Sequence, residues 1–266
     1  MIHQGFDGGM SVTSSPALTR LFKSFARERP PVQRLLPPWS LTEVLKVLAK
    51  PPFEPLSKAS LKHLTMKTVF LLAIASGRRR SAIHALSSAE GHIRWEPSGV
   101  RLLPKPGFVA KNQDALSGGL DIVLRAISEV SSVAEDKVWC PVRALKYYVR
   151  ETEELRHDSQ LFIITREPFN PASKSTISRW IVDTILKAGP SVLSKELAPG
   201  ATPRAHDTRS VSASWALFQG VKLSEIQRAA SWASANTFIN CYLRDVPAAE
   251  GSFSVAALGG AAAAAR

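Results

Sequence analysis

Residues 58–86 read KASLKHLTMKTVFLLAIASGRRRSAIHAL and decide the expected centre of the fold. Apolar residues recur here at helical spacing and predict a helix over residues 58–76. One face of that helix is made up of Leu61, Leu64, Thr68, Leu71, Leu72 and Ala75. Gly77 breaks the pattern, and three consecutive arginines then begin a second helix that carries Ile83 and Leu86. The stretch therefore joins a core-forming helix to a dense cluster of positive charge.

Helical patterns continue on both sides of this centre. Upstream, Ser40 precedes LTEVLKVLAK and is followed three residues later by Glu43, which is the spacing of a capping box at a helix start. Downstream, Val142, Leu145 and Val149 share one helical face. Further helices are predicted over residues 173–188, 205–219 and 223–231.

The region between residues 91 and 125 has a different pattern. The runs HIRWEP, GVRLLP and GLDIVL are short, favour β-structure and are separated by Pro and Gly. They predict a small three-stranded antiparallel sheet, and LFIIT at 161–165 is a further extended run. The expected fold class is therefore mainly α with one small antiparallel sheet.

The chain is expected to form one main domain between two less regular ends. Its 266 residues are 45% hydrophobic, which is enough to bury a sizeable core. Residues 1–38 are expected to be a disordered remnant and a Pro-rich linker, with a basic helix over 16–29. Residues 39–248 carry the domain, and residues 249–266 form a low-complexity tail.

Net charge gives the first indication of function. Lys and Arg number 34 against 22 Asp and Glu, a formal charge of +12. A surplus of this size favours a polyanion partner, with nucleic acid the commonest, and the alternative is a solubilising positive surface. The 2 cysteines lack metal-ligand spacing and favour a reduced compartment. The sequence has no apolar run of membrane-spanning length and no secretory signal, so we expect a chain that is neither membrane-bound nor secreted.

Residues 204–210, RAHDTRS, suggest phosphoryl-transfer chemistry. His206 lies one helical turn before Arg209, and Arg204 is just upstream. Two guanidinium groups can hold the non-bridging oxygens of a phosphodiester, and an imidazole can move a proton beside them. The chain lacks a P-loop and prominent paired carboxylates, so a tyrosine nucleophile that works without a metal suits this cationic set better than a two-metal site.

The chain has only 3 tyrosines to supply that nucleophile. Tyr147 and Tyr148 lie in the helix after the sheet, away from the cationic clusters in the sequence. Tyr242 lies in NTFINCYLRD, downstream of a predicted helix and of Trp232.

In this order the motifs resemble the signature of the tyrosine recombinases, also called phage-type integrases. SGRRRSAIHAL resembles the first arginine box and selects Arg79, while HDTR matches the box that contains His206 and Arg209. GVKLSEIQRAASW places Trp232 at the family's His/Trp position, and TFINCYLRD supplies Tyr242 as the nucleophile. The resemblance covers residues 39–246 and is strongest to recombinases encoded by DIRS-type retrotransposons.

The resemblance implies a tyrosine recombinase catalytic-domain fold and a metal-free DNA strand transfer with no nucleotide cofactor. Tyr242 would attack a scissile phosphate, form a 3′-phosphotyrosine link and release a 5′-hydroxyl. Arg79, Arg209, His206 and Trp232 would stabilise the transition state, and Lys111 would protonate the departing oxygen, with Lys105 as the alternative lysine. Residues expected to contact the DNA backbone are Arg78, Arg80, Lys105 and Arg204.

The implied partner is double-stranded DNA, bound by a homo-oligomer that is a tetramer on two DNA sites. The implied process is recombination or integration of a transposable element, in the nucleus if the element is eukaryotic and otherwise in the cytoplasm. Two departures qualify this expectation. Ala82 stands where the family usually has an acidic residue, and Trp232 and Tyr242 are ten residues apart where nine is commoner.

Three other functions compete with an active recombinase. The first is a catalytically impaired derivative that binds DNA, which Ala82 favours. The second is a type IB topoisomerase, which shares the same constellation of residues. The third is an interaction protein with a basic surface, in which Arg79 faces solvent, Trp232 is ordinary core and Lys111 is a loop lysine.

Overall fold

The computed structural model describes residues 6–7, 10–11, 15–28, 37–110, 121–129, 131, 133–193, 202–232 and 235–244. The chain divides into two units, Met1–Arg34 and Leu35–Arg266. In the first unit, β1 (Phe6–Asp7) pairs antiparallel with β2 (Met10–Ser11), which the composition did not predict. The predicted basic helix is α1 (Pro16–Glu28).

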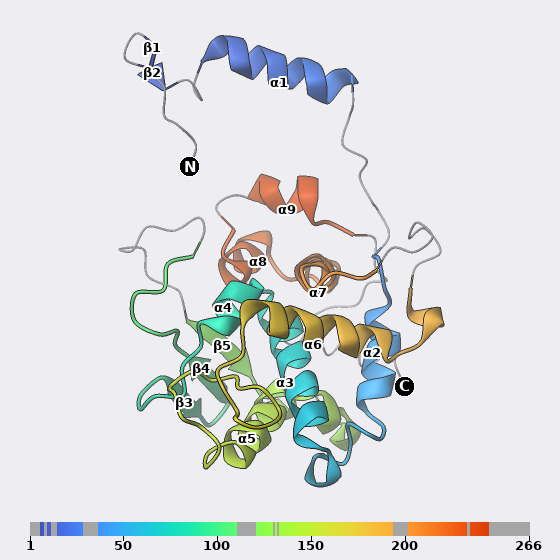
Figure 1. Ribbon diagram of the computed structural model, residues 1–266. Helices are drawn as coiled ribbons and strands as arrows, with labels where there is room; N and C mark the ends of the chain where they lie inside the picture. The colour runs from blue at the N-terminus through green and yellow to red at the C-terminus, as the bar shows by residue number, and fades with distance from the viewer. Residues whose placement is uncertain are drawn as a thin grey trace. The chain divides into compact units, whose positions relative to one another are not determined.

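The second unit is built around α3 (Leu61–Ser76), which lies among α5, α6 and the other helices in Figure 1. The backbone N–H of His63 donates to the side chain of Ser60 at the start of α3, and Gly77 ends the helix in the left-handed conformation, with φ of 60°. Every residue from Leu64 to Ser76 is buried, so burial extends beyond the face that the apolar pattern marked. The reason is that α4, α5, α6, α7 and β5 all pack against this helix.

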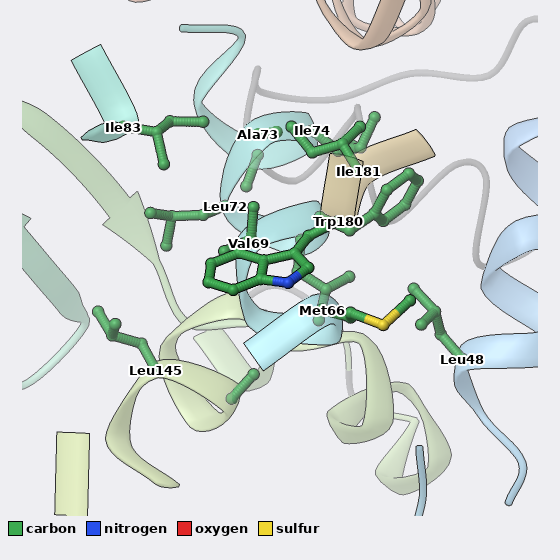
Figure 2. Close-up of a cluster of buried hydrophobic side chains, with 14 of the residues drawn as sticks. Leu48, Met66, Val69, Leu72, Ala73, Ile74, Ile83, Leu145, Trp180 and Ile181 are labelled. Atoms are coloured by element: carbon green, nitrogen blue, oxygen red, sulfur yellow. The ribbon is translucent and has the colours of Figure 1, made fainter. Parts of the chain in front are cut away.

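Side chains from several elements converge on α3 to form the core. Figure 2 shows Trp180 of α6 lying against Val69 and Leu72 of α3, with Leu145 of α5 beside them. These residues are at most 4% exposed. The other helices of this unit are α2 (Leu41–Leu48), α4 (Arg80–His84), α5 (Pro141–Glu151), α6 (Lys174–Leu186), α7 (Asp207–Phe218), α8 (Leu223–Ala230) and α9 (Ala235–Cys241), of which α4, α5, α6 and α7 pack against α3. Short 3-10 turns are η2 (Leu56–Lys58), η3 (Ile127–Glu129), η4 (Ala134–Trp139) and η5 (Pro190–Val192).

Most of the predicted helices are present, with changed boundaries. The capping interaction at α2 is confirmed, since the backbone N–H of Glu43 donates to Ser40 Oγ at 3.3 Å. The helix after the arginines is short, because α4 ends at His84 and Leu86 pairs instead with Pro104 in an isolated bridge. The run at 161–165 forms only a bridge between Ile163 and Pro171.

The predicted antiparallel sheet is confirmed, with strand order β3 (Ile93–Glu96), β4 (Gly99–Leu102) and β5 (Ile122–Arg125). Val100 pairs with Leu124, and both side chains are buried on the face towards the helices. Gly99 is required at its position, because a Cβ there would lie 2.0 Å from the Leu124 carbonyl oxygen. The fold is therefore mainly helical with one small three-stranded sheet. None of the helices described is long and apolar enough to span a membrane.

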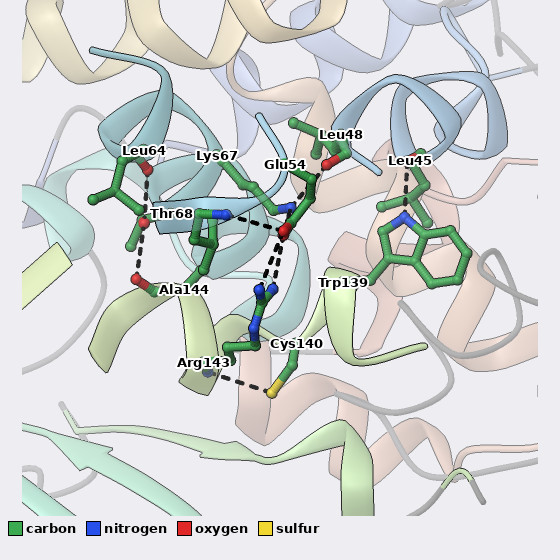
Figure 3. A network of polar contacts seen from close by, with 11 residues as sticks. Leu45, Leu48, Glu54, Leu64, Lys67, Thr68, Trp139, Cys140, Arg143 and Ala144 are labelled. Atoms are coloured by element: carbon green, nitrogen blue, oxygen red, sulfur yellow. Dashed lines mark hydrogen bonds and ion pairs between the residues drawn. The ribbon is translucent and has the colours of Figure 1, made fainter. Parts of the chain in front are cut away.

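A buried carboxylate, Glu54, links three segments of the core (Figure 3). Its Oε1 lies 2.6 Å from Lys67 Nζ on α3, and Arg143 of α5 donates to both of its oxygens at 2.7 and 3.1 Å. Lys67 also donates to the carbonyl of Leu48 at the end of α2. Burial tends to raise the pKa of Glu54, but the bonds from Arg143 and Lys67 hold that pKa below its usual value. Burial lowers the pKa of Lys67 to about 8, so at neutral pH this site is an ionised triad.

We expect Glu54→Gln to lower the free energy of unfolding by about 3 kcal/mol or more, because Lys67 would keep a buried charge without its counter-ion. The matched control is Glu43→Gln, which breaks an exposed 2.9 Å pair with Lys46 and should cost less than about 1 kcal/mol. Urea unfolding of both variants measures the difference. Equal losses would show that the triad has no special part in joining α2, α3 and α5.

Candidate active site

The three arginines at residues 78–80 spread apart because the backbone turns sharply after α3. Gly77 takes the left-handed conformation, and Arg79 is extended at the N-cap of α4, with φ of −68° and ψ of 149°. Arg78 is buried and its Nη2 donates to the carbonyl of Asp121 at 2.8 Å. Arg79 is half-buried, and Arg80 is exposed with its Nη1 bonded to Ser178 Oγ at 2.8 Å. The turn therefore places Arg78 in the interior, Arg79 partly in solvent and Arg80 on the surface.

The start of α7 brings a second cationic group to the same place. His206 is the N-cap of α7, and Arg209 lies in its first turn. The Arg209 side chain is 1% exposed, and its Nη1 donates to the carbonyls of Gly77 at 2.7 Å and Ala230 at 3.0 Å. Arg209 thus ties the beginning of α7 to the ends of α3 and α8.

The candidate nucleophile, Tyr242, reaches this group from just beyond the end of α9. The Tyr242 hydroxyl lies 2.8 Å from His206 Nε2. The Arg209 guanidinium carbon lies 4.8 Å from the ring centroid of Trp232 and 5.8 Å from that of Tyr242. Trp232 in turn stacks on Phe238, which is fully buried, with ring centroids 5.1 Å apart. Residues from four distant segments therefore meet around one guanidinium.

A cavity of about 590 Å³ opens beside these residues. Its charged lining comes from residues 78–80, Lys174, Arg204, His206 and Arg209, and none of the described lining residues is acidic. Three buried donor atoms, Arg209 Nε, Arg209 Nη2 and Trp232 Nε1, have no hydrogen-bond partner in the described part of the chain. Buried donors without partners are costly in free energy, and a lining rich in cations attracts negative charge, so this arrangement favours an anion.

The electrostatics of the empty site keep His206 neutral. The pKa of His206 is lowered to about 4, first because part of the ring is buried, although the residue also has solvent-exposed surface. The positive charges of Arg209, Arg79, Arg204 and Arg80 lower the pKa further. Burial also lowers the pKa of Arg209, as does the neighbouring charge of Arg79, but a guanidinium stays charged at neutral pH. A neutral imidazole can accept a proton from the Tyr242 hydroxyl.

The other predicted site residues have different positions. Lys111 lies outside the described residues. Lys105 does not line the cavity, and its ammonium is 2.7 Å from the carboxylate of Asp158. Arg204 lines the cavity, and its backbone N–H donates to Asp207 Oδ2 at 2.8 Å.

Ala82 is 8% exposed and borders a second hollow of only about 10 Å³, which is shared with Arg78, Arg79 and Arg209. Ala82, where the resemblance leads us to expect an acidic residue, thus lies directly beside buried arginines.

The two remaining tyrosines are not part of the site, although each has an arginine near its ring. Arg150 lies 4.5 Å from the Tyr147 centroid, and Arg156 lies 5.4 Å from the Tyr148 centroid. Tyr148 is fully buried, and its hydroxyl accepts a hydrogen bond from the backbone N–H of Ile163. Each ring thus has an arginine from outside the two cationic clusters beside it, whereas Tyr242 is the tyrosine that contacts His206 and Arg209 among the described residues.

Sequence reasoning missed two residues of the cavity wall, Lys174 and Ser178 of α6. The helix itself was predicted, but no motif marks these positions, and only the packing of α6 against α4 brings them to the arginines. In the described ranges, no group of three or more His, Cys, Asp or Glu residues is placed to hold a metal ion.

Comparison with known proteins places the fold among the tyrosine recombinase catalytic domains. No family model and no curated protein matches the chain. Solved structures do match, among them XerH site-specific recombinase bound to difH, with a TM-score of 0.51 and 16% identity over 90% of this chain and 64% of that one. XerA recombinase matches with a TM-score of 0.48 and 18% identity over 84% of this chain and 66% of that one. A lambda integrase tetramer bound to a Holliday junction matches with a TM-score of 0.45 and 17% identity over 86% of this chain and 57% of that one. The chain thus spans less than two thirds of each of these proteins, and at such identities the likeness concerns the fold alone.

We expect the imidazole of His206 to titrate well below its usual value, near pH 4, and to titrate closer to neutrality when inorganic phosphate occupies the cavity and offsets the arginine charges. The pKa of His206 is lower in the folded protein than in the unfolded chain. His206 therefore contributes to the free energy of unfolding above about pH 6.5, and this contribution is lost as the pH falls towards the pKa of the folded state. NMR titration, with the resonance assigned by His206→Asn, measures the shift. In Arg79→Ala the phosphate effect should shrink, and a titration near pH 6.5 that phosphate leaves unchanged would contradict the electrostatic account.

Proposed function

We propose that this chain is a DNA strand transferase that cleaves and rejoins DNA through a phosphotyrosine intermediate. The observation that carries the proposal is the 2.8 Å contact between Tyr242 and His206 beside the buried guanidinium of Arg209, at the edge of a cationic cavity. A phenol, a neutral imidazole and unneutralised arginines together provide the nucleophile, the proton acceptor and the anion stabiliser that phosphoryl transfer requires.

In the proposed reaction, the Tyr242 oxygen attacks the scissile phosphorus while its proton passes to His206 Nε2. A bond forms between the phenolic oxygen and phosphorus, and the bond from phosphorus to the 5′ oxygen breaks. The extra charge on the non-bridging oxygens is stabilised by Arg79, by Arg209 Nε and Nη2, and by the indole N–H of Trp232. Lys111 is the proposed donor of the proton to the 5′ oxygen. Attack by a 5′-hydroxyl on the phosphotyrosine reverses the sequence and rejoins the strand.

The biological role that we propose is site-specific recombination or integration for a mobile element of the DIRS type, carried out by an oligomer on double-stranded DNA. The support for this finer statement is the sequence resemblance over residues 39–246, together with the net charge of +12. Among the structures of similar fold, the lambda integrase is a tetramer bound to a Holliday junction, and the XerH recombinase is bound to its difH substrate before cleavage.

A nicked suicide duplex that carries the target site tests the proposal, because cleavage releases the short strand and leaves protein joined to DNA. We expect a covalent adduct on denaturing gels with the wild type and none with Tyr242→Phe. The matched control Tyr147→Phe should retain the adduct, since the Tyr147 ring lies beside Arg143 and Arg150, whereas Tyr242 lies at His206 and Arg209. Arg79→Ala should slow adduct formation about 10²- to 10³-fold, as expected for loss of one oxyanion-stabilising group. Persistence of the adduct in Tyr242→Phe would refute the assignment of the nucleophile.

A second candidate function is DNA binding without cleavage. The observation that favours it is Ala82, which is buried beside Arg78, Arg79 and Arg209 where the resemblance leads us to expect a carboxylate. Without that carboxylate, the mutual repulsion of the arginines has no counter-charge from this position. The suicide-duplex assay separates the two functions, because salt-sensitive DNA binding with no adduct from the wild type would identify the impaired derivative.

We also propose that Tyr242 serves the arginines of its own subunit. Phe238 is fully buried on α9 and stacks on Trp232, and the backbone N–H of Arg244 donates to Ser214 Oγ of α7 at 2.7 Å. These contacts hold both sides of Tyr242 against the domain that carries His206. Detaching α9 to serve a neighbouring subunit would expose Phe238 and leave the site without its phenol.

Mixing two inactive variants tests which subunit supplies the phenol. We expect Arg79→Ala mixed with Tyr242→Phe to give no more adduct than either variant alone, because no subunit then holds both an intact arginine cluster and a phenol. The readout is the same covalent adduct, with DNA binding of the mixture measured as the control. Restoration of the adduct would mean that α9 is exchanged between subunits.

A further inference from the structure

We propose that the cavity holds two adjacent phosphates of one DNA strand, and that Arg80, Lys174 and Ser178 form the subsite for the second one. This inference deepens the proposed function and rests on it, because the first phosphate is the one that Tyr242 attacks. None of the motifs in the sequence assigns a role to Lys174 or Ser178, and the chemical class recognised by their subsite is a DNA backbone phosphodiester.

The size of the cavity is the first argument for a second subsite. A volume of about 590 Å³ lies within the range of roughly 300–1,000 Å³ typical of pockets that take drug-sized ligands, and is far larger than one phosphate group needs. The cations are also divided between two walls. Arg79, His206 and Arg209 come from the turn after α3 and the start of α7, whereas Arg80, Lys174 and Ser178 come from α4 and α6. A single phosphate at Arg209 leaves the α4–α6 wall without an anion.

The α4–α6 wall has the construction of a binding site. Ser178 Oγ accepts a hydrogen bond from Arg80 Nη1 at 2.8 Å and so fixes the direction of an otherwise exposed guanidinium. Lys174 is the first residue of α6, where the helix dipole adds to its positive potential, and Ser173 caps the helix. Neither Arg80 nor Lys174 forms a salt bridge within the described ranges, so both charges remain available to a phosphate.

An independent observation shows that this cavity is suited to anions. Arg209 is 1% exposed and lines the cavity, and its Nε and Nη2 have no partner among the residues described. The field of Lys174 also reaches the end of α4, since burial and the charges of Lys174 and Lys105 lower the pKa of His84. A DNA strand whose scissile phosphate lies at Arg209 would therefore meet Arg80 and Lys174 at the seam between α4 and α6.

Two single-charge variants of α6 test the subsite. Lys174→Ala removes a cation that lines the cavity, and Arg179→Ala removes an exposed cation on the same helix that does not line it. Binding of a fluorescent mixed-sequence duplex is measured by anisotropy over a range of salt concentrations. For Lys174→Ala we expect a Kd about tenfold higher and a salt slope lower by about 1, which corresponds to one lost phosphate contact. For Arg179→Ala we expect less than about a twofold change, as for a charge that acts only through a screened field.

Ser178→Ala provides a third variant without any change in net charge. It releases the Arg80 guanidinium, and we expect a Kd about threefold higher because the released side chain loses entropy again on binding. Thermal unfolding of all three variants checks that the fold is intact. Equal effects of Lys174→Ala and Arg179→Ala, or no effect of Lys174→Ala, would overturn the subsite.

These outcomes are distinguishable from failure of the proposed function. If the wild type gives no covalent adduct but Lys174→Ala still lowers the salt slope, the strand-transfer proposal fails and the phosphate subsite stands. If the wild type gives the adduct and Lys174→Ala binds DNA like the wild type, the subsite fails and strand transfer stands.

Discussion

The candidate site depends on one buried guanidinium. Arg209 Nη1 bonds to the carbonyls of Gly77 and Ala230, so the ends of α3 and α8 and the start of α7 are held at one point. The same side chain lies over Trp232 and has no carboxylate partner within the described ranges. A buried charge without a counter-ion is destabilising, and its retention here is explained if the missing counter-charge is supplied by a ligand.

The two buried cationic centres of the chain differ in how their charge is compensated. At one, Lys67 and Arg143 share the carboxylate of Glu54, which satisfies the charges and joins α2, α3 and α5. At the other, Arg79 and Arg209 meet beside Ala82 with no acidic residue in the described lining, while the neighbouring Arg78 interacts with Asp121. Both centres are attached to α3, the compensated one in the middle of the helix and the uncompensated one at its end. The stable core thus supports a site in which uncompensated charge can bind an anion.

The sequence predicted the elements of the fold better than their environment. Periodicity identified the helices, and β-favouring runs identified the sheet, because these patterns follow from local geometry. The burial of α3 on all sides was missed, since one face of apolar residues does not reveal how many neighbours a helix has. The shortness of α4 was also missed, because Leu86 has a helical spacing from Ile83 but is taken into a bridge with Pro104.

The site shows the same division between pattern and packing. Arg79, His206, Arg209, Trp232 and Tyr242 were selected by their order in the chain, and the structure brings them together. The backbone bonds of Arg209 were beyond prediction, because they depend on where α3 and α8 end relative to α7. Lys174 and Ser178 were missed for a related reason: they carry no motif, and only tertiary packing gives them a position beside Arg80.

The placement of His206 explains how strand transfer would be coupled to DNA binding. Burial and four arginines make the imidazole of His206 a weak base, and its Nε2 lies 2.8 Å from the Tyr242 hydroxyl. A phosphodiester among the same arginines brings negative charge close to the ring, and this raises the basicity of the imidazole. The proton acceptor would then become effective only when the group to be attacked is in place. The cations that bind the phosphate would in this way also control when the nucleophile forms.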